Sequence, residues 1–443
     1  MRVHGGILAL VAAMAILPPH LKAAAEDESI ASSFLLAPED DLELKSMQLL
    51  SNPQVVRARR QGEQDLLASL PNALPETRSH FREAVDEIAF FGILNGLNDD
   101  PLHPRITVVG RPGRMVRSVK ILAPKGLDEN PDSIYRIIPV DGTSTYVLRG
   151  RVAANRLVVN EFSVLDDDWK TVGNLSSGML KTDAGGGFAI TVGPDPAAGR
   201  DNYIQTRPGA NYMTIRDTMG DWARERPNAL TVERVAGPPA GPALTRERVL
   251  EKVVAKVRRY FAETIKLHRK MLAAPANEFP QPSISSAQGM LVTQAYSIGR
   301  FELAKDQALV LTIHPGTAKY VTVPITNLWG VTMDPVHHLS SRNSCQVAAN
   351  PDGSFTVVVS AVDPGLENWV DTEGLTEGFL FLRWAAMEGN PSAMAKPAVE
   401  SKLVSLANLP KAAPAMLGKV DQAGRARQIV KRAADYDLRW TSN

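Results

Sequence analysis

Five ionisable side chains between residues 334 and 383 have types and spacings that suit acid–base chemistry. The stretch "MDPVHHLSSRN" contains Asp334, His337 and His338, and "ENWVDTEGLTEGFLFLRW" contains Asp371 and Arg383. An aspartate and a histidine three or four residues apart in a turn can come within hydrogen-bonding distance, which general acid–base catalysis requires. An arginine nearby would hold an anionic group of a substrate. The alternative is a turn around Pro335 with solvated histidines.

The same residues do not predict a metal or a cofactor. Adjacent residues on a strand, such as His337 and His338, point to opposite faces and cannot easily bind one ion. The chain contains no His-x-His or His-Glu-x-x-His spacing, no glycine-rich loop that opens a helix and no Gly-x-Ser-x-Gly turn. The single cysteine, Cys345, excludes an intrachain disulfide. We expect Cys345 to be a small core residue, with a nucleophile as the alternative.

Composition and the N-terminus indicate an exported globular protein. The chain has 443 residues, 22% of them charged, and a net charge of +1, without the clustered basic residues that nucleic-acid binding needs. Residues 1–25 have the pattern of a cleavable signal peptide, with an apolar run from Gly5 to Leu17. That run is shorter than the roughly 20 residues needed to span a bilayer. We expect a periplasmic protein that does not span the membrane.

The elements that must position these side chains are mainly strands. Residues 26–104 read as a helical lead-in, whose firmest helix, in "PETRSHFREAVDEIAFFGILNGL", is expected to end at Asn95-Gly96 and Asn98-Asp99-Asp100-Pro101. In residues 105–234, short Val-, Ile- and Tyr-rich runs separated by turn residues predict a first β-domain. Asp141-Gly142 lies between two such runs and predicts a β-hairpin.

The second half repeats this order. Residues 235–280 read as a linker followed by an amphipathic helix with Thr245 as its N-cap. Residues 281–388 predict a second β-domain, and residues 389–443 a tail with a short helix. The fold class predicted is therefore mainly β, with two tandem jelly-roll-like β-sandwich domains, an intervening amphipathic helix, and helical N- and C-terminal segments.

An internal repeat supports two related β-domains. The segment Asn202-Tyr203-Ile204-x-Thr206 matches Asn368-Trp369-Val370-x-Thr372. Phe188 and Arg216 match Phe355 and Arg383, and Ser176-Ser177 matches Ser340-Ser341 more weakly. Residues present in both copies are best explained by the shared fold: the asparagines would satisfy loop backbone groups, and the arginines would pair with a carboxylate or cap carbonyls. Asp371, which replaces Gln205, is then the better functional candidate.

Several of these stretches resemble a known bacterial family. "NLWGVTMD", Asn350-Pro351-Asp352-Gly353, "VVVSAVDPGLENWVDTEG" and "FLFLRW" are similar to the domain of unknown function 1214, often found with the domain of unknown function 1254. The resemblance covers roughly Asn130 to Trp384, because "DENPDSIYRIIPVDGTSTYVLRGRV" is similar to the region in front of such domains. It implies a β-sandwich and an envelope setting, and no reaction. Asn327-Leu328-Trp329 departs from the family pattern, in which a cation is expected.

Two functions follow as hypotheses. The first is a non-catalytic binder of a small molecule or glycan, in a groove between the two β-domains. The second is a cofactor-independent hydrolase or lyase acting on a small, apolar substrate, with Asp334 and His337 or His338 as acid and base and Arg383 holding an anion. A pocket shared by His337, Asp371 and Arg383 would favour the enzyme. Burial of Arg383 in a loop-capping network would weaken it.

Overall fold

The strands of the first half form two sheets that enclose one core. The computed structural model describes residues 40–284, 290–387, 396–412 and 417–440, so the expected signal peptide lies outside the described residues. One sheet has the order β1 (Thr107–Val109), β4 (Ser133–Pro139), β10 (Ala210–Thr218), β6 (Val159–Asp166) and β7 (Thr171–Ser176). The other has the order β11 (Ala229–Ala236), β5 (Thr145–Arg151), β8 (Gly187–Gly193) and β9 (Tyr203–Gln205). Apolar residues from both sheets, including Phe162 and Leu148, fill the space between them.

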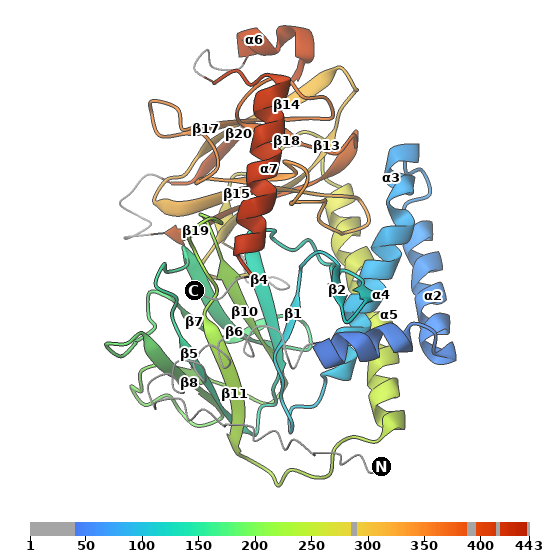
Figure 1. Cartoon of the computed structure of the whole chain (residues 1–443), viewed down its shortest axis with the longest axis vertical. Coiled ribbons are helices and arrows are strands. Elements are labelled where there is room, and N and C mark those ends of the chain that lie inside the picture. Colours follow the sequence, from blue (N-terminus) through green and yellow to red (C-terminus); the bar gives the residue numbers. More distant parts are fainter. Residues whose placement is uncertain (1–39, 285–289, 388–395, 413–416, 441–443) are drawn as a thin grey trace, which may run out of the picture.

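The second half repeats this arrangement strand for strand. Its five-stranded sheet has the order β12 (Ser283–Ile284), β13 (Ala295–Glu302), β19 (Glu377–Met387), β15 (Ala318–Thr326) and β16 (Ser341–Asn343). Its four-stranded sheet has the order β20 (Ala398–Ser405), β14 (Gln307–His314), β17 (Phe355–Ser360) and β18 (Trp369–Asp371). In each half the last pair of the smaller sheet, β8–β9 or β17–β18, is parallel. The equal strand orders support the internal repeat, and the prediction of a mainly β chain is confirmed (Figure 1).

The repeated asparagines do the same structural task in both halves. Asn202 donates to and accepts from the backbone of Lys181, at 2.7 and 2.8 Å, and Asn368 does so with Ala348, at 2.8 Å in both directions. The neighbouring aromatic residues are also equivalent, because Tyr203 and Trp369 each donate to a carbonyl at the end of the adjacent strand. The structure thus confirms that these residues serve the fold.

Two expectations about the strands were wrong. β4 and β5 do not form a hairpin, since they belong to different sheets, and Asp141-Gly142 carries the chain from one sheet to the other. The carboxylate of Asp141 accepts from the N–H groups of Thr143 and Ser144 and so fixes this crossing. The second sheet pair also continues past residue 388, because β20 pairs with β14.

The serine match is out of register. Arg216 lies opposite Glu161, which pairs with Ser176, whereas Arg383 lies opposite Thr322, which pairs with Asn343. The structural equivalent of Ser176 is therefore Asn343, two residues beyond Ser341.

Helices cover one side of both sheet pairs. They are α2 (Pro53–Ser69), α3 (Pro75–Ser79), α4 (Phe81–Leu97) and α5 (Arg246–Leu272), and α5 starts at the predicted N-cap, Thr245, whose hydroxyl accepts from Arg248 N at 3.3 Å. Figure 1 shows this group beside the sheets, with α7 (Gln422–Leu438) crossing another face. The remaining elements are the helical residues 40–49 and the short β2 (Arg114–Val116), β3 (Val119–Ile121), η1 (Leu406–Asn408) and α6 (Leu409–Ala412).

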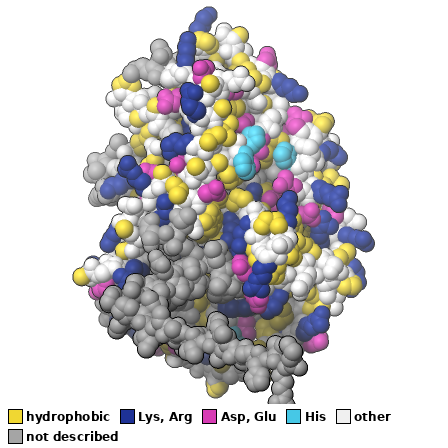
Figure 2. Space-filling view, viewed as in Figure 1, with side chains coloured by type: hydrophobic (Ala, Val, Ile, Leu, Met, Phe, Trp, Pro, Cys, Tyr) yellow, Lys and Arg dark blue, Asp and Glu magenta, His cyan; other side chains and the backbone are white. Residues whose placement is uncertain are grey.

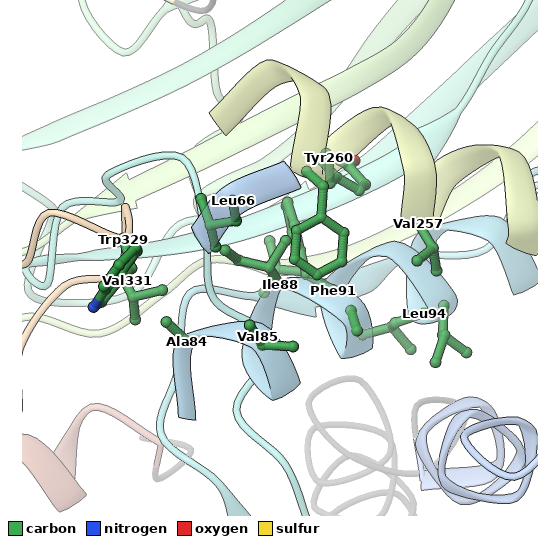
Figure 3. Packing of buried hydrophobic residues seen from close by; sticks show 14 of the residues in the cluster. Leu66, Ala84, Val85, Ile88, Phe91, Leu94, Val257, Tyr260, Trp329 and Val331 are labelled. Atoms are coloured by element: carbon green, nitrogen blue, oxygen red, sulfur yellow. The ribbon is translucent and has the colours of Figure 1, made fainter. Parts of the chain in front are cut away.

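Close contact between α4 and α5 depends on glycine. A Cβ added to Gly92 would lie 2.7 Å from Val257 Cα, and one added to Gly96 would overlap Val253. Gly96 therefore lies inside α4 as a packing residue, and the helix ends at Leu97 with Asn98 as its C-cap, at the second of the two expected end signals. Figure 3 shows Phe91 of α4 close to Tyr260 of α5, with ring centroids 4.3 Å apart.

Helix α7 joins the two halves through buried arginines seven residues apart. Arg425 forms two hydrogen bonds to Asp363, at 2.8 and 2.9 Å. Arg432 donates to Pro335 O and Ser341 Oγ, and Arg439 donates to Pro131 O at 2.6 Å. Residues seven apart lie on one helix face, so these three arginines point inward from the helix and are buried. The last helix thus docks on its own chain.

Candidate functional site

A cavity of about 160 Å³ lies where the two five-stranded sheets approach each other, with α4 and α5 on a further side. We call it the central cavity. Alternate residues of β10, such as Ile215, face the core of their own sheet pair, so Arg216 faces the other way and lines the cavity. The same alternation on β19 places Leu382 in the core and Arg383 in the cavity. Both sheets are therefore buried on both faces, which explains the apolar run before Arg383.

Each arginine lies beside an equivalent tyrosine. Arg216 is opposite Tyr135 on β4, and Arg383 is opposite Tyr296 on β13. The hydroxyl of Tyr135 accepts from Asn130 N at 2.8 Å, and that of Tyr296 accepts from Leu291 N at 2.9 Å, in both cases from the residue five positions earlier. The central cavity is thus lined by one arginine and one tyrosine from each half, in matching places.

The remaining walls of the central cavity are largely apolar. They comprise Phe91 of α4, Leu267 of α5, Leu127, Trp169 and Phe381. The ring of Trp169 meets that of Tyr260 edge-on with centroids 5.6 Å apart, while its indole N–H has no hydrogen-bond partner among the described residues. An arginine pair beside aromatic walls suits a ligand that has both a charge and an apolar body.

A polar loop, Gly126 to Asn130, closes the cavity between the two tyrosines. Arg383 Nη2 donates to Asp128 O at 2.7 Å and Nη1 donates to Phe381 O at 3.2 Å, so Arg383 caps carbonyls as expected. The carboxylate of Asp128 pairs with His268 Nε2 at 2.9 Å. Burial raises the pKa of Glu129 to about 7, against the opposing charge of Lys125. The loop therefore presents carboxylates to the same cavity as the arginines.

The predicted acid–base residues form two separate pairs. His337 Nδ1 lies 2.8 Å from Asp334 Oδ2, and His338 Nδ1 lies 2.8 Å from Asp371 Oδ2. His337 is largely exposed, with 72% of its side-chain area accessible, and His338 is 44% exposed. Both histidines therefore lie at the protein surface, each fixed by one carboxylate.

Electrostatics couple His338 to its surroundings. Burial acts to lower the pKa of His338. The hydrogen bond that Asp371 accepts, and the negative charges of Glu373, Asp371 and Asp334, outweigh burial and raise this pKa. Burial raises the pKa of Glu373 to about 7, although the charge of His338 opposes this. Figure 2 shows histidine side chains next to acidic ones on the displayed face. The arrangement can exchange protons near neutral pH.

These pairs do not share a site with Arg383. Asp334, His337 and Glu373 line a second cavity of about 180 Å³, which we call the lateral cavity, together with Glu87 and Lys125. Arg383 lines the central cavity and caps a loop carbonyl. His338 and Asp371 pair with each other and line neither cavity, so the five predicted residues are divided among three places. This arrangement weakens the hydrolase or lyase hypothesis.

Sequence reasoning missed most of the central cavity. Tyr135 and Tyr296 are the one pair with a usable signal. Each lies on the strand that pairs with β10 or β19, five residues after the backbone N–H that donates to its hydroxyl. Trp169 and Asp128 come from loops and left no periodic pattern. The expectation of a buried Cys345 was wrong, since this residue is exposed.

The described part of the chain contains neither a membrane-spanning helix nor a cluster of metal ligands. No helix there is long and apolar enough to cross a membrane. Within the same residues, no group of three or more His, Cys, Asp or Glu side chains is placed to hold a metal ion.

Comparisons with known proteins confirm the resemblance for one segment and show the fold. Residues 324–386 match the model of a family described as a protein of unknown function, DUF1214. A putative uncharacterised protein from Burkholderia cenocepacia has a similar crystal structure, with a TM-score of 0.70, 22% identity, and coverage of 82% of this chain and 100% of that one. A Vibrio parahaemolyticus protein is more distant, with a TM-score of 0.39, 12% identity, and coverage of 63% and 91%. Among curated proteins, none matches this sequence.

Proposed function

We propose that the protein is an exported, non-catalytic binding protein that holds a small organic anion with an apolar body in the central cavity. The observation that carries the proposal is the convergence of Arg216 and Arg383, each from the middle strand of its sheet, on one cavity. Two guanidinium groups in a partly desolvated place favour a carboxylate strongly. The jelly-roll topology and the boundaries 105–234 and 281–388, with β20 added to the second, are part of this proposal.

The apolar walls favour a compact hydrocarbon body over a glycan. Trp169, Phe91 and Phe381 supply aromatic surface, and the indole N–H of Trp169 is a donor with no partner among the described residues. A volume of about 160 Å³ suits a short branched or aromatic carboxylate. Removing such a body from water adds roughly 25 cal/mol per Å² of apolar surface buried.

The test is calorimetric titration of the mature chain with phenylpropanoate, isocaproate and the neutral phenethyl alcohol. We expect the two carboxylates to bind, and the alcohol to bind at least about tenfold more weakly. Arg216→Gln and Arg383→Gln should each weaken carboxylate binding by a similar factor. Arg224→Gln is the matched control, because that side chain is 81% exposed on a turn. Carboxylate binding that is unchanged in both arginine variants would contradict the proposal.

Folding of the variants needs its own check, since Arg383 also caps Asp128 O. Arg383→Lys keeps the charge, and thermal melting separates a folding defect from lost binding. Export is tested separately by N-terminal sequencing of the secreted chain, which we expect to begin at Glu26.

The alternative remains a hydrolase or lyase that uses the Asp334–His337 pair at the lateral cavity and the Asp371–His338 pair at the surface beside it. Both contacts of 2.8 Å have the reach that proton transfer needs. Metabolite screening of wild type and His337→Ala separates the two functions. Turnover that disappears in His337→Ala would favour the enzyme, and ligand binding unaffected by that substitution would favour the binding protein.

A further inference from the structure

We infer that the ligand of the central cavity is a zwitterion, of the kind represented by an apolar α-amino acid, with its ammonium group next to its carboxylate. This inference rests on the proposed function, because it assigns the ligand's anion to Arg216 and Arg383. It adds a second, cationic group and a position for it. The evidence is a pair of buried carboxylates that line the same cavity.

Asp128 and Glu129 are the two carboxylates. They are 2% and 8% exposed, respectively, and both line the central cavity. Asp128 Oδ2 contacts His268 and Glu129 Oε2 accepts from Gly126 N at 3.3 Å. Asp128 Oδ1 and Glu129 Oε1 have no hydrogen-bond partner among the described residues. A buried carboxylate oxygen without a donor costs stability, so a ligand that supplies N–H donors there gains affinity.

The positions of these acids relative to the arginines fit one small molecule. Arg383 donates to the backbone carbonyl of Asp128 at 2.7 Å, so the guanidinium and the acidic loop are in direct contact. At the other end of the loop, Asn130 N donates to Tyr135, which lies opposite Arg216. In an α-amino acid the ammonium and carboxylate groups are attached to one carbon. They are therefore close enough together to meet the acidic loop and the neighbouring guanidinium groups at the same time.

The internal repeat gives the cavity a polar end and an apolar end. Asn130 and Leu291 are equivalent because each donates its backbone N–H to the repeated tyrosine five residues later. Glu129, the residue before Asn130, is therefore equivalent to Met290, and both line the cavity. The cavity lining thus contains an acidic residue from one half where the other half contributes a methionine. A molecule with an ammonium group at one end and a hydrocarbon side chain at the other fits this difference.

The test uses ligands that differ only in their charged groups. Phenylalanine, phenylpropanoate and phenethylamine form one series, and leucine, isocaproate and isoamylamine form a second. Titration of the mature wild-type chain should show the amino acid of at least one series binding ten times or more tightly than both of its partners. Because Asp128 and Glu129 hold only the ammonium group, Asp128→Asn and Glu129→Gln should weaken amino-acid binding at least tenfold. The same variants should leave carboxylate binding equal or tighter.

The outcomes distinguish this inference from the proposed function. If phenylpropanoate and isocaproate bind as tightly as the amino acids, and the binding depends on Arg216, the zwitterion is wrong and the anion site stands. If neither carboxylates nor amino acids bind, both are wrong. Equal loss of amino-acid and carboxylate binding in Glu129→Gln, with an unchanged melting temperature, would also overturn the zwitterion. Glu247→Gln is the control, because Glu247 is an exposed acid in the first turn of α5 that does not line the cavity.

Discussion

The hydroxyl of Thr293 donates a 2.9 Å hydrogen bond to the carboxylate of Glu161, although the two residues are 132 positions apart. The reverse contact joins the halves elsewhere, because Thr322 donates to Asp132 at 2.8 Å. Glu161 and Thr322 occupy equivalent positions, because each lies opposite a repeated arginine in its sheet. Asp132 and Thr293 are also equivalent, because each precedes a repeated tyrosine by three residues. The same pair of positions thus joins the halves twice, with acid and hydroxyl exchanged.

The two acids differ in how completely they are satisfied. Asp132 is fully buried and accepts from Trp222, Asn343, Tyr320 and Thr322. Glu161 accepts from Thr293, and its Oε2 has no partner among the described residues. Burial raises the pKa of Glu161 to about 7, although the Thr293 hydrogen bond and the charge of Arg216 oppose this. Glu161 is therefore expected to titrate near neutral pH.

The stability of the protein should depend on pH through Glu161. Its pKa is higher in the folded state than in the unfolded chain, so the folded state binds more protons between these values and loses stability as pH rises through about 7. Glu161→Gln should therefore raise the free energy of unfolding at about pH 8 by roughly 1–3 kcal/mol relative to wild type, and change it little at about pH 4. Urea unfolding at both pH values measures this. Equal effects at the two pH values would contradict the prediction.

Gly92→Ala should separate α4 from α5. The added methyl group would lie 2.7 Å from Val257 Cα and 2.9 Å from Val257 N, and backbone cannot move aside as a side chain can. We expect the free energy of unfolding to fall by about 1–3 kcal/mol. Gly241→Ala is the control, because nothing lies within 4 Å of the added methyl group there, and it should have almost no effect. Urea denaturation measures both variants.

Arg432→Met should loosen the C-terminal helix. The substitution removes donors to Pro335 O and Ser341 Oγ and the stacking of the guanidinium on Trp222, 4.3 Å from its ring centroid. A loss of about 2–4 kcal/mol is expected, because buried acceptors are left without partners. The exposed Arg427→Met is the control on the same helix. Limited proteolysis should cut the Arg432 variant earlier within this helix than the control, and the same cleavage rate in both would contradict the prediction.

Asp371→Asn should lower the pKa of His338. The hydrogen bond and charge of Asp371 raise this pKa, and burial, which lowers it, would remain. NMR titration of the ring protons measures the change, with Asp334→Asn as a comparison at the neighbouring pair. In wild type, the stability gained from protonated His338 is complete below the unfolded pKa near 6.5 and is lost as pH rises through the higher folded value. This dependence should diminish in Asp371→Asn.

Local signals in the sequence predicted the helices well. Thr245 and the apolar stripe beginning at Val249 identified α5. Caps and periodicity are short-range properties, so they can be read from one segment. Asp141-Gly142 was misleading because a turn signal does not say whether the next strand joins the same sheet. That choice depends on which core Ile138 and Leu148 must fill together.

The candidate site was harder to predict. The repeat of Arg216 in Arg383 was read as a property of the fold, and the carbonyl contacts of Arg383 support this reading. However, duplication also brought the two arginines to the same cavity, which no comparison of the copies as separate domains could reveal. Asp371 differs between the copies as expected, but its partner is His338 at the protein surface, away from the central cavity. The repeated arginines therefore both support the fold and line the candidate site.

The contact between Arg439 and Pro131 has a consequence for how the chain reaches its native state. It closes a loop of 308 residues, and Arg439 is among the last residues of the described chain. Closing so long a loop carries a large entropic cost that only simultaneous packing can offset. The join between the halves cannot be completed while the ribosome still holds the C-terminus. Closure of the two halves through α7 therefore depends on packing that forms late, after the strands that it joins are in place.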